Sequence, residues 1–168
     1  MDVPSGTTVP VERSYLERVW IDVLTVDRAA GLYALGIVDE GTGDCALPLM
    51  SGHTHADVQD AFEDRWLSLR GISNCVVSDR GRELLKPESI EFFEKQGTAK
   101  EATPAYDSDA HGRVERFFNT IRWTLDRVCA SEDKPTGASE WRRVLRAAEN
   151  SARNEVLRGG YSSSQRAT

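Results

Sequence analysis

The first strand of this chain is predicted by one short segment, Arg18-Val19-Trp20-Ile21-Asp22-Val23-Leu24-Thr25-Val26. It is short and filled with β-branched and aromatic residues, which together predict a buried β-strand. Asp22, in its middle, breaks the pattern. A buried carboxylate is costly unless it is paired, hydrogen-bonded or bound to a metal ion. Asp22 is therefore a candidate functional residue, although a satisfied structural aspartate, or a strand with one side open to solvent, would also explain it.

The remaining elements follow from changes in hydrophobic period and from turn residues. These predict strands at 32–38, 45–49, 74–78 and 98–102, and helices from Thr54 to Gly71, from Pro87 to Lys95, after Gly112, and from about Ser139 to Leu157. The segment Gly41-Thr42-Gly43-Asp44 reads as a hairpin turn, so the first three strands are expected to be antiparallel. The order predicts an α/β domain in which helices pack on a mixed sheet.

Composition narrows the class of protein. The chain has 168 residues, of which 39% are hydrophobic and 29% charged, as expected of one globular domain. No apolar run approaches the roughly 20 residues that span a bilayer. No signal peptide is visible, and three scattered cysteines form no disulfide framework, so we expect an intracellular protein with no membrane partner. The net charge of −6 argues against a stand-alone nucleic-acid binder, but not against carboxylates that hold metal ions on DNA.

Two further acids occupy informative positions. Asp79 follows the strand at 74–78, where α/β sheets place ligands, although a turn aspartate is an equally good reading. Glu115 is expected in the first turn of the helix after Gly112, where the helix dipole favours an acid anyway. Thirty-five residues separate Asp79 from Glu115. Neither acid is decisive alone, but the set of three acids is informative.

Together the local sequences resemble the D,D-35-E signature of retroviral and LTR-retrotransposon integrases. The matching segments are Trp20-Ile21-Asp22, Ser78-Asp79-Arg80-Gly81-Arg82-Glu83-Leu84, Ala105-Tyr106 through Gly112-Arg113-Val114-Glu115-Arg116, and Gly160-Tyr161-Ser162-Ser163-Ser164-Gln165. Leu84 stands where the family has an aromatic residue. The resemblance covers roughly 15–168. It implies a ribonuclease-H-like fold, a mixed five-stranded sheet with three antiparallel strands and then two parallel ones, flanked by helices.

The resemblance also implies a chemistry. Asp22 would bridge two Mg²⁺ or Mn²⁺ ions, and Asp79 and Glu115 would each complete one site. Hard divalent cations prefer carboxylate oxygens, and two of them can serve both the attacking and the leaving oxygen of an in-line displacement. Attack by water gives 3′-end processing of DNA, and attack by a 3′-hydroxyl gives strand transfer. The expected enzyme is a metal-dependent polynucleotidyl transferase or endonuclease that needs no covalent nucleophile.

Candidate DNA contacts surround the third acid. Glu115, Asn119 and Arg122 are spaced i, i+4 and i+7, so they share one face of their helix. Arg122 is predicted to contact DNA phosphate, with a solvated arginine as the alternative. Tyr106 and His111 flank a segment that resembles the mobile catalytic loop of the family.

The expected organisation is a polar lead-in at 1–14, a catalytic core at 15–158 and a tail at 159–168 that leads to a further domain. The partners implied are element-end and target DNA, chromosomal DNA in a nucleus if the element is eukaryotic. A second copy of the chain is also expected, with the face from Trp141 to Ala148 as its candidate contact. His53 and His55 could suggest metal ligands, but no cysteine pair or third histidine completes a site, so we expect surface residues at a helix start.

Two other functions fit the same residues. One is an insertion-sequence-type transposase or a nuclease of the same fold, which the flanking sequence would separate from a retroelement integrase. The other is a domesticated, non-catalytic module that binds DNA or protein. The presence of all three acids argues against the second, and a metal-dependent strand-transfer assay would decide it.

Overall fold

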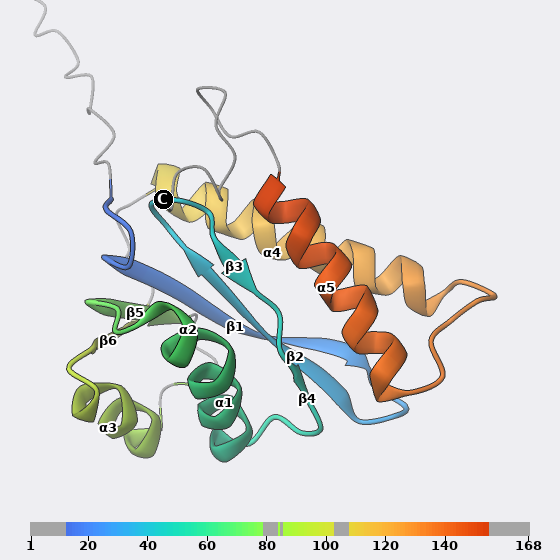
Figure 1. Ribbon diagram of the computed structural model, residues 1–168, viewed down its shortest axis with the longest axis horizontal. Coiled ribbons are helices and arrows are strands. Elements are labelled where there is room, and N and C mark those ends of the chain that lie inside the picture. Colours follow the sequence, from blue (N-terminus) through green and yellow to red (C-terminus); the bar gives the residue numbers. More distant parts are fainter. Residues whose placement is uncertain (1–12, 79–83, 85, 103–107, 155–168) are drawn as a thin grey trace, which may run out of the picture.

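The computed structural model describes residues 13–78, 84, 86–102 and 108–154. Its elements, shown in Figure 1, are β1 (Arg18–Asp27), β2 (Leu32–Asp39), β3 (Cys45–Ala46), β4 (Leu49–Met50), α1 (His55–Phe62), η1 (Glu63–Leu67), α2 (Ser68–Arg70), β5 (Cys75–Ser78), α3 (Pro87–Lys95), β6 (Ala99–Ala102), α4 (Ser108–Cys129) and α5 (Ala138–Asn154). No helix among these residues is long and apolar enough to cross a membrane.

The strands form one mixed sheet in the order β3-β2-β1-β5-β6, with β4 also paired to β2. β1 and β2 are antiparallel, whereas β5 is parallel to both β1 and β6. This confirms the predicted mixed sheet, with one difference. The strand expected at 45–49 is divided into β3 and β4, because the Leu47 amide donates to a carboxylate oxygen of Glu149, 2.6 Å away, and Pro48 has no amide proton. The described sheet therefore has six strands.

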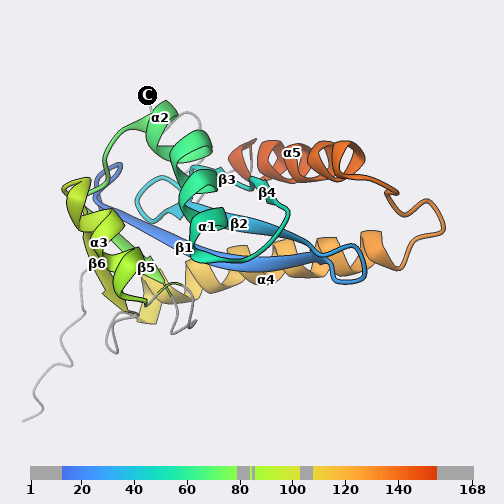
Figure 2. The ribbon, with the colours of Figure 1, turned by 90° about the horizontal axis from the view of Figure 1, so that it is seen from below.

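Alternate residues of the strands feed two separate cores. Val19 and Ile21 belong to the core beneath α1 and α3, whereas Trp20, Leu24 and Val26 belong to the core that includes α4 and α5. Figure 2 shows α4 and α1 on opposite sides of β1 and β2. The central strand is thus covered on both faces, as its apolar sequence predicted.

The helix before Gly71 confirms its predicted cap. The Thr54 side chain accepts from the Asp57 amide, and the Asp57 side chain accepts from the Thr54 amide. The helical segment passes through a π-helical turn, η1, which carries the fully buried Trp66, and it ends at Gly71, whose φ is 89°. His55, at the start of α1, pairs its Nδ1 with Ser89 Oγ of α3 at 3.0 Å.

Helix α4 begins earlier than the sequence predicted. It starts at Ser108, so Gly112 lies inside it and Glu115 is not in its first turn. A glycine inside a helix costs only about 1 kcal/mol relative to alanine. The apolar seam that α4 buries against the sheet outweighs that cost. Its buried members are Val114, Phe118, Ile121 and Leu125.

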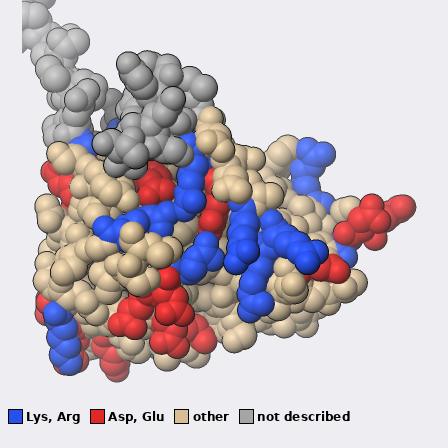
Figure 3. Space-filling model, in the orientation of Figure 1, with Lys and Arg blue, Asp and Glu red and all other residues tan. Residues whose placement is uncertain are grey.

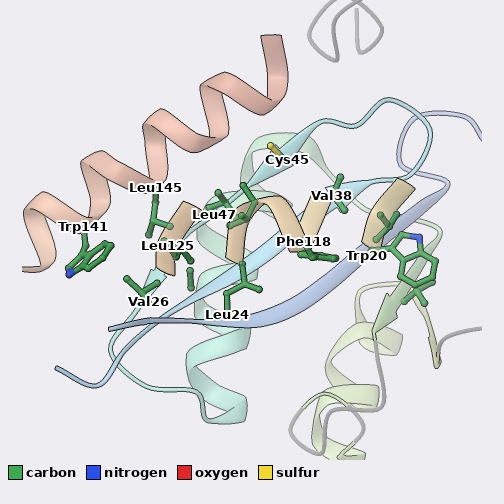
Figure 4. Packing of buried hydrophobic residues seen from close by; sticks show 14 residues of the cluster. Trp20, Leu24, Val26, Val38, Cys45, Leu47, Phe118, Leu125, Trp141 and Leu145 are labelled. Carbon is green, nitrogen blue, oxygen red and sulfur yellow. The ribbon is translucent and has the colours of Figure 1, made fainter. Parts of the chain in front are cut away.

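The predicted contact face of α5 is also wrong in part. Trp141 and Leu145 are each 1% exposed within this single chain, where they pack with Val26, Leu47 and Leu125 (Figure 4). A run of apolar residues at helical spacing cannot say whether it faces its own sheet or another molecule. These two side chains are therefore unavailable to a second copy. The helix end predicted at Leu157 lies outside the described residues.

Candidate active site on strand β1 and helix α4

Asp22 lies on the α4 side of the sheet. It stands between Trp20 and Leu24 in the alternation of β1, and both of those side chains pack in the α4 core (Figure 4). Its own side chain keeps 22% of its surface exposed. The strand is therefore buried along most of its length but reachable from solvent at Asp22. This is one of the alternatives that the sequence left open.

A glycine lets α4 approach the sheet beside Asp22. Gly36 of β2 is the register partner of Asp22. A Cβ at Gly36 would lie 2.5 Å from a ring carbon of Phe118, closer than real Cβ contacts come. Phe118 therefore rests directly on the β2 backbone and fixes the height of α4 above β1. A glycine inside a predicted strand is the signal that would have found this position.

Three predicted residues come together at this point. Arg122 donates from Nη2 to Asp22 Oδ2 and from Nη1 to Asn119 Oδ1, the latter at 3.3 Å. Arg122 is half-exposed and Asn119 is exposed. Arg122 is therefore not simply a solvated arginine, because in this structure it links α4 to the carboxylate of β1.

Glu115 is exposed and lies one helical turn before Asn119, on the same face of α4. Asp79 and Tyr106 lie outside the described residues, as does the side chain of His111. The backbone still locates the end of β5, because Ser78 is the register partner of Ile21. The last described residue before Asp79 is thus level with the residue before Asp22.

Lys100 is a nearby residue that the sequence did not single out. From β6, its Nζ donates to Ser78 Oγ and to the Glu101 carbonyl, the latter at 3.2 Å. Burial lowers the pKa of Lys100 to about 8. Lys100 therefore ties β6 to the carboxyl end of β5. No local pattern points to it, since the contact depends on how β5 and β6 pair.

The donor set suits a hard divalent cation. Asp22 of β1 and Glu115 of α4 supply carboxylate oxygens that solvent reaches. The two elements pack together beside Gly36 of β2. The Asp22 carboxylate already takes a positive partner, the guanidinium of Arg122. Within the described part of the chain no three ligating side chains cluster, and the predicted third acid is outside it. Asp22 and Glu115 are thus the described residues that would hold metal.

Other carboxylates are buried more deeply but are already satisfied. Asp39 is fully buried and accepts from the Leu16 amide and from Thr42. Asp44 accepts from Arg70, Arg153 and the Tyr15 hydroxyl. Asp44, Asp39 and Glu149 together hold the β2–β3 turn and the edge strands in place. They are structural.

No family model matches the sequence, and no curated protein sequence matches it significantly. Solved structures do match. The HTLV-2 integrase catalytic core domain in complex with magnesium, in a dimeric form, matches with a TM-score of 0.71 and 18% identity, over 94% of this chain and 99% of that one. The BIV integrase catalytic core matches with a TM-score of 0.68 and 17% identity, over 88% and 91% of the two chains.

A third match is a simian T-cell lymphotropic virus intasome in complex with the PP2A regulatory subunit B56 gamma. The TM-score is 0.73 and the identity 13%, over 92% of this chain and 55% of that one. This chain therefore spans about half the length of that matched chain. Two catalytic cores match over nearly the whole of both chains with TM-scores of 0.71 and 0.68. The chain therefore has the ribonuclease-H-like fold of retroviral integrase catalytic cores.

Proposed function

We propose that this chain is the catalytic core of a DNA integrase, which processes DNA 3′ ends and joins them to target DNA. The observation that carries the proposal is the meeting of Asp22 with Arg122 and Asn119, one helical turn from Glu115, on the fold of integrase cores. The matched HTLV-2 core was solved with magnesium, which supports the use of a divalent ion here. The proposed setting is inside the cell, on chromosomal DNA.

Each residue has a role in the proposed reaction. Mg²⁺ or Mn²⁺ held by Asp22, Asp79 and Glu115 would activate the attacking oxygen and stabilise the leaving one, most effectively as a pair of ions. Arg122, once released from Asp22, would contact a DNA phosphate. Asn119 would orient that guanidinium. The packing of α4 on the sheet at Gly36 of β2 would keep the carboxylates of α4 and β1 at a fixed separation. This matters because small displacements of catalytic groups strongly lower the reaction rate.

Disintegration of a branched DNA substrate tests the proposal, because this reaction depends least on domains outside the catalytic core. Glu115→Gln keeps the size of the side chain and removes its charge. Because Glu115 is exposed and lies inside α4, we expect little change in stability and a collapse of Mn²⁺-dependent activity. Glu132→Gln, an exposed acid after α4, is the matched control and should keep full activity. Wild-type rates in Glu115→Gln would contradict the catalytic assignment.

The same assay separates the alternatives. A wild type that cleaves DNA but never joins strands would favour a nuclease of this fold. A wild type that binds DNA and catalyses neither step would favour a non-catalytic module. An insertion-sequence-type transposase shares the joining chemistry, so the element ends that the protein prefers would distinguish it.

We also propose that the core forms a homo-oligomer through α1 and α5, with their polar faces in contact. A groove of 340 Å³ runs between them. One wall carries Asp57, Asp60 and Asp64, and the other carries Arg142 and Arg146. Figure 3 shows the acidic patch over α1 beside the basic band over α5. A two-fold axis would place the acids of one copy against the arginines of the other, and the matched HTLV-2 core was solved in a dimeric form.

Charge reversal tests this interface. Asp60→Arg and Arg146→Glu should each shift the protein toward monomer in light scattering, because each places like charges together. The double variant restores opposite charges and should recover the oligomer. A wild type that stays monomeric at high concentration, or a double variant no better than either single one, would overturn the proposed contact.

A further inference from the structure

Helix α4 presents an exposed tryptophan on the side opposite its apolar seam. Trp123 is 59% exposed, whereas Trp20, Trp66 and Trp141 are at most 4% exposed. The seam residues nearest in sequence, Ile121 and Leu125, are buried. Because successive helical residues turn by about 100°, Trp123 points away from the core. Among the described residues, the core packing does not include this side chain.

An arginine is paired with this indole. The guanidinium carbon of Arg127 lies over the Trp123 ring, 4.6 Å from its centroid. This cation–π contact pairs the exposed ring with a basic side chain one helical turn farther along α4. Arg116 lies seven residues before Trp123 and is exposed on the same side of α4. Arg116, Trp123 and Arg127 form what we name the outer stripe of α4.

The outer stripe is basic in a chain whose net charge is −6. From 113 to 127, α4 carries four exposed arginines and two exposed carboxylates. The stripe begins beside Glu115 and runs away from it, so that Trp123 is about 12 Å farther along the helix axis, at 1.5 Å per residue. Its charge therefore favours an anionic partner that also reaches the site at Glu115.

We propose that the outer stripe binds unpaired nucleotides of a DNA end, with a base stacked on Trp123 and phosphates held by Arg116 and Arg127. Aromatic rings beside cationic side chains are the general means of holding single-stranded nucleic acid, because every base has a π-face. A paired base inside a duplex has no free face to offer. The stripe thus selects frayed or tailed ends over blunt duplex. The inference rests on the proposed function, because it takes DNA to be the substrate.

Tryptophan fluorescence provides a direct test in the unmodified chain, since Trp123 is the exposed one of four tryptophans. The probes are a short blunt duplex and the same duplex with a short single-stranded tail. The tailed duplex should quench the exposed emission, and Trp123→Phe should lose that signal while keeping most of the affinity. Trp123→Ala should weaken tailed-duplex binding by roughly tenfold, since stacking on one aromatic is worth about 1–3 kcal/mol, and leave blunt-duplex binding nearly unchanged.

The control is Leu69→Ala, which removes another exposed apolar side chain, 67% exposed on α2. It should alter neither probe. If wild type binds tailed DNA with unchanged Trp123 emission, or if Trp123→Ala binds the tailed duplex as tightly as wild type does, the stripe inference fails and the proposed function stands. If wild type binds neither probe, both fail. A Trp123→Ala variant that changes oligomeric state in light scattering but not DNA affinity would assign the stripe to a second copy of the chain instead.

Discussion

Two groups of carboxylates in this molecule differ in what their oxygens contact. Around the β2–β3 turn and α5, Asp39, Asp44 and Glu149 are at most 9% exposed. They accept hydrogen bonds from amide, hydroxyl and guanidinium groups of the chain itself. On β1 and α4, Asp22 and Glu115 remain within reach of solvent. Deep burial thus marks the carboxylates that build the fold. The carboxylates that we propose as metal ligands are accessible ones, on two elements that pack against each other.

The largest expected effect on stability belongs to the buried group. Glu149 accepts from the Leu47 amide at 2.6 Å and from Arg65 Nη2 at 3.0 and 3.2 Å. Glu149→Ala leaves both donors without this acceptor, and we expect the free energy of unfolding to fall by about 3–5 kcal/mol. The remaining folded protein should keep its rate in the disintegration assay. Urea denaturation measures the change, with Glu132→Ala as an exposed control.

Gly36→Ala tests whether the packing of α4 on the sheet positions the accessible carboxylates Asp22 and Glu115. The added methyl would press on Phe118, which is 6% exposed and cannot easily move. We expect a loss of about 1–3 kcal/mol from overpacking. Activity per folded molecule should fall about 100-fold as α4 shifts from β1. Gly137→Ala, where a Cβ meets nothing within 4 Å, is the matched control. Unchanged activity in Gly36→Ala would show that the height of α4 does not control the site.

The smallest effect concerns Lys100. Its pKa in the fold is about 8, below the ordinary 10.5, because burial disfavours the charged form. Between these values the unfolded chain binds the extra proton, so the Lys100 contribution to stability rises with pH across that window. Lys100→Met should remove this contribution. We expect the difference in unfolding free energy between wild type and variant to change from pH 8 to 10.5 and to stay flat below. A difference independent of pH would exclude the lowered pKa.

Most helix and strand positions could be predicted from the sequence, because they depend on local residue patterns and capping residues. Pro87 and Lys95 bound α3 as expected, and the Thr54 cap and Gly71 end hold. Asp22 could be identified because it is a carboxylate in the middle of an otherwise apolar strand. What depended on long-range pairing was missed. The acceptor Glu149 divides a strand a hundred residues away, and Lys100 reaches Ser78 only because β5 and β6 pair.

The faces of helices were harder to predict than their bounds. The apolar pattern of α5 could not distinguish an internal core from a subunit contact, and the structure places Trp141 in the former. Gly112 was expected to precede α4 because glycine is a poor helix former, but the seam carries the helix past it. The exposure of Trp123 could have been found by placing it on the wheel of the same seam.

We propose that the accessible carboxylates Asp22 and Glu115 hold a divalent cation and that the buried carboxylates do not. Thermal melting with and without millimolar Mn²⁺ measures this difference. Ligand binding to the folded state raises the melting temperature. We expect Mn²⁺ to raise the melting temperature of wild type and to have almost no effect on that of Asp22→Asn or Glu115→Gln. We also expect that Asp44→Asn melts lower throughout but keeps the full Mn²⁺ shift. An equal Mn²⁺ response in wild type, Asp22→Asn and Glu115→Gln would show that these two carboxylates are not the metal ligands.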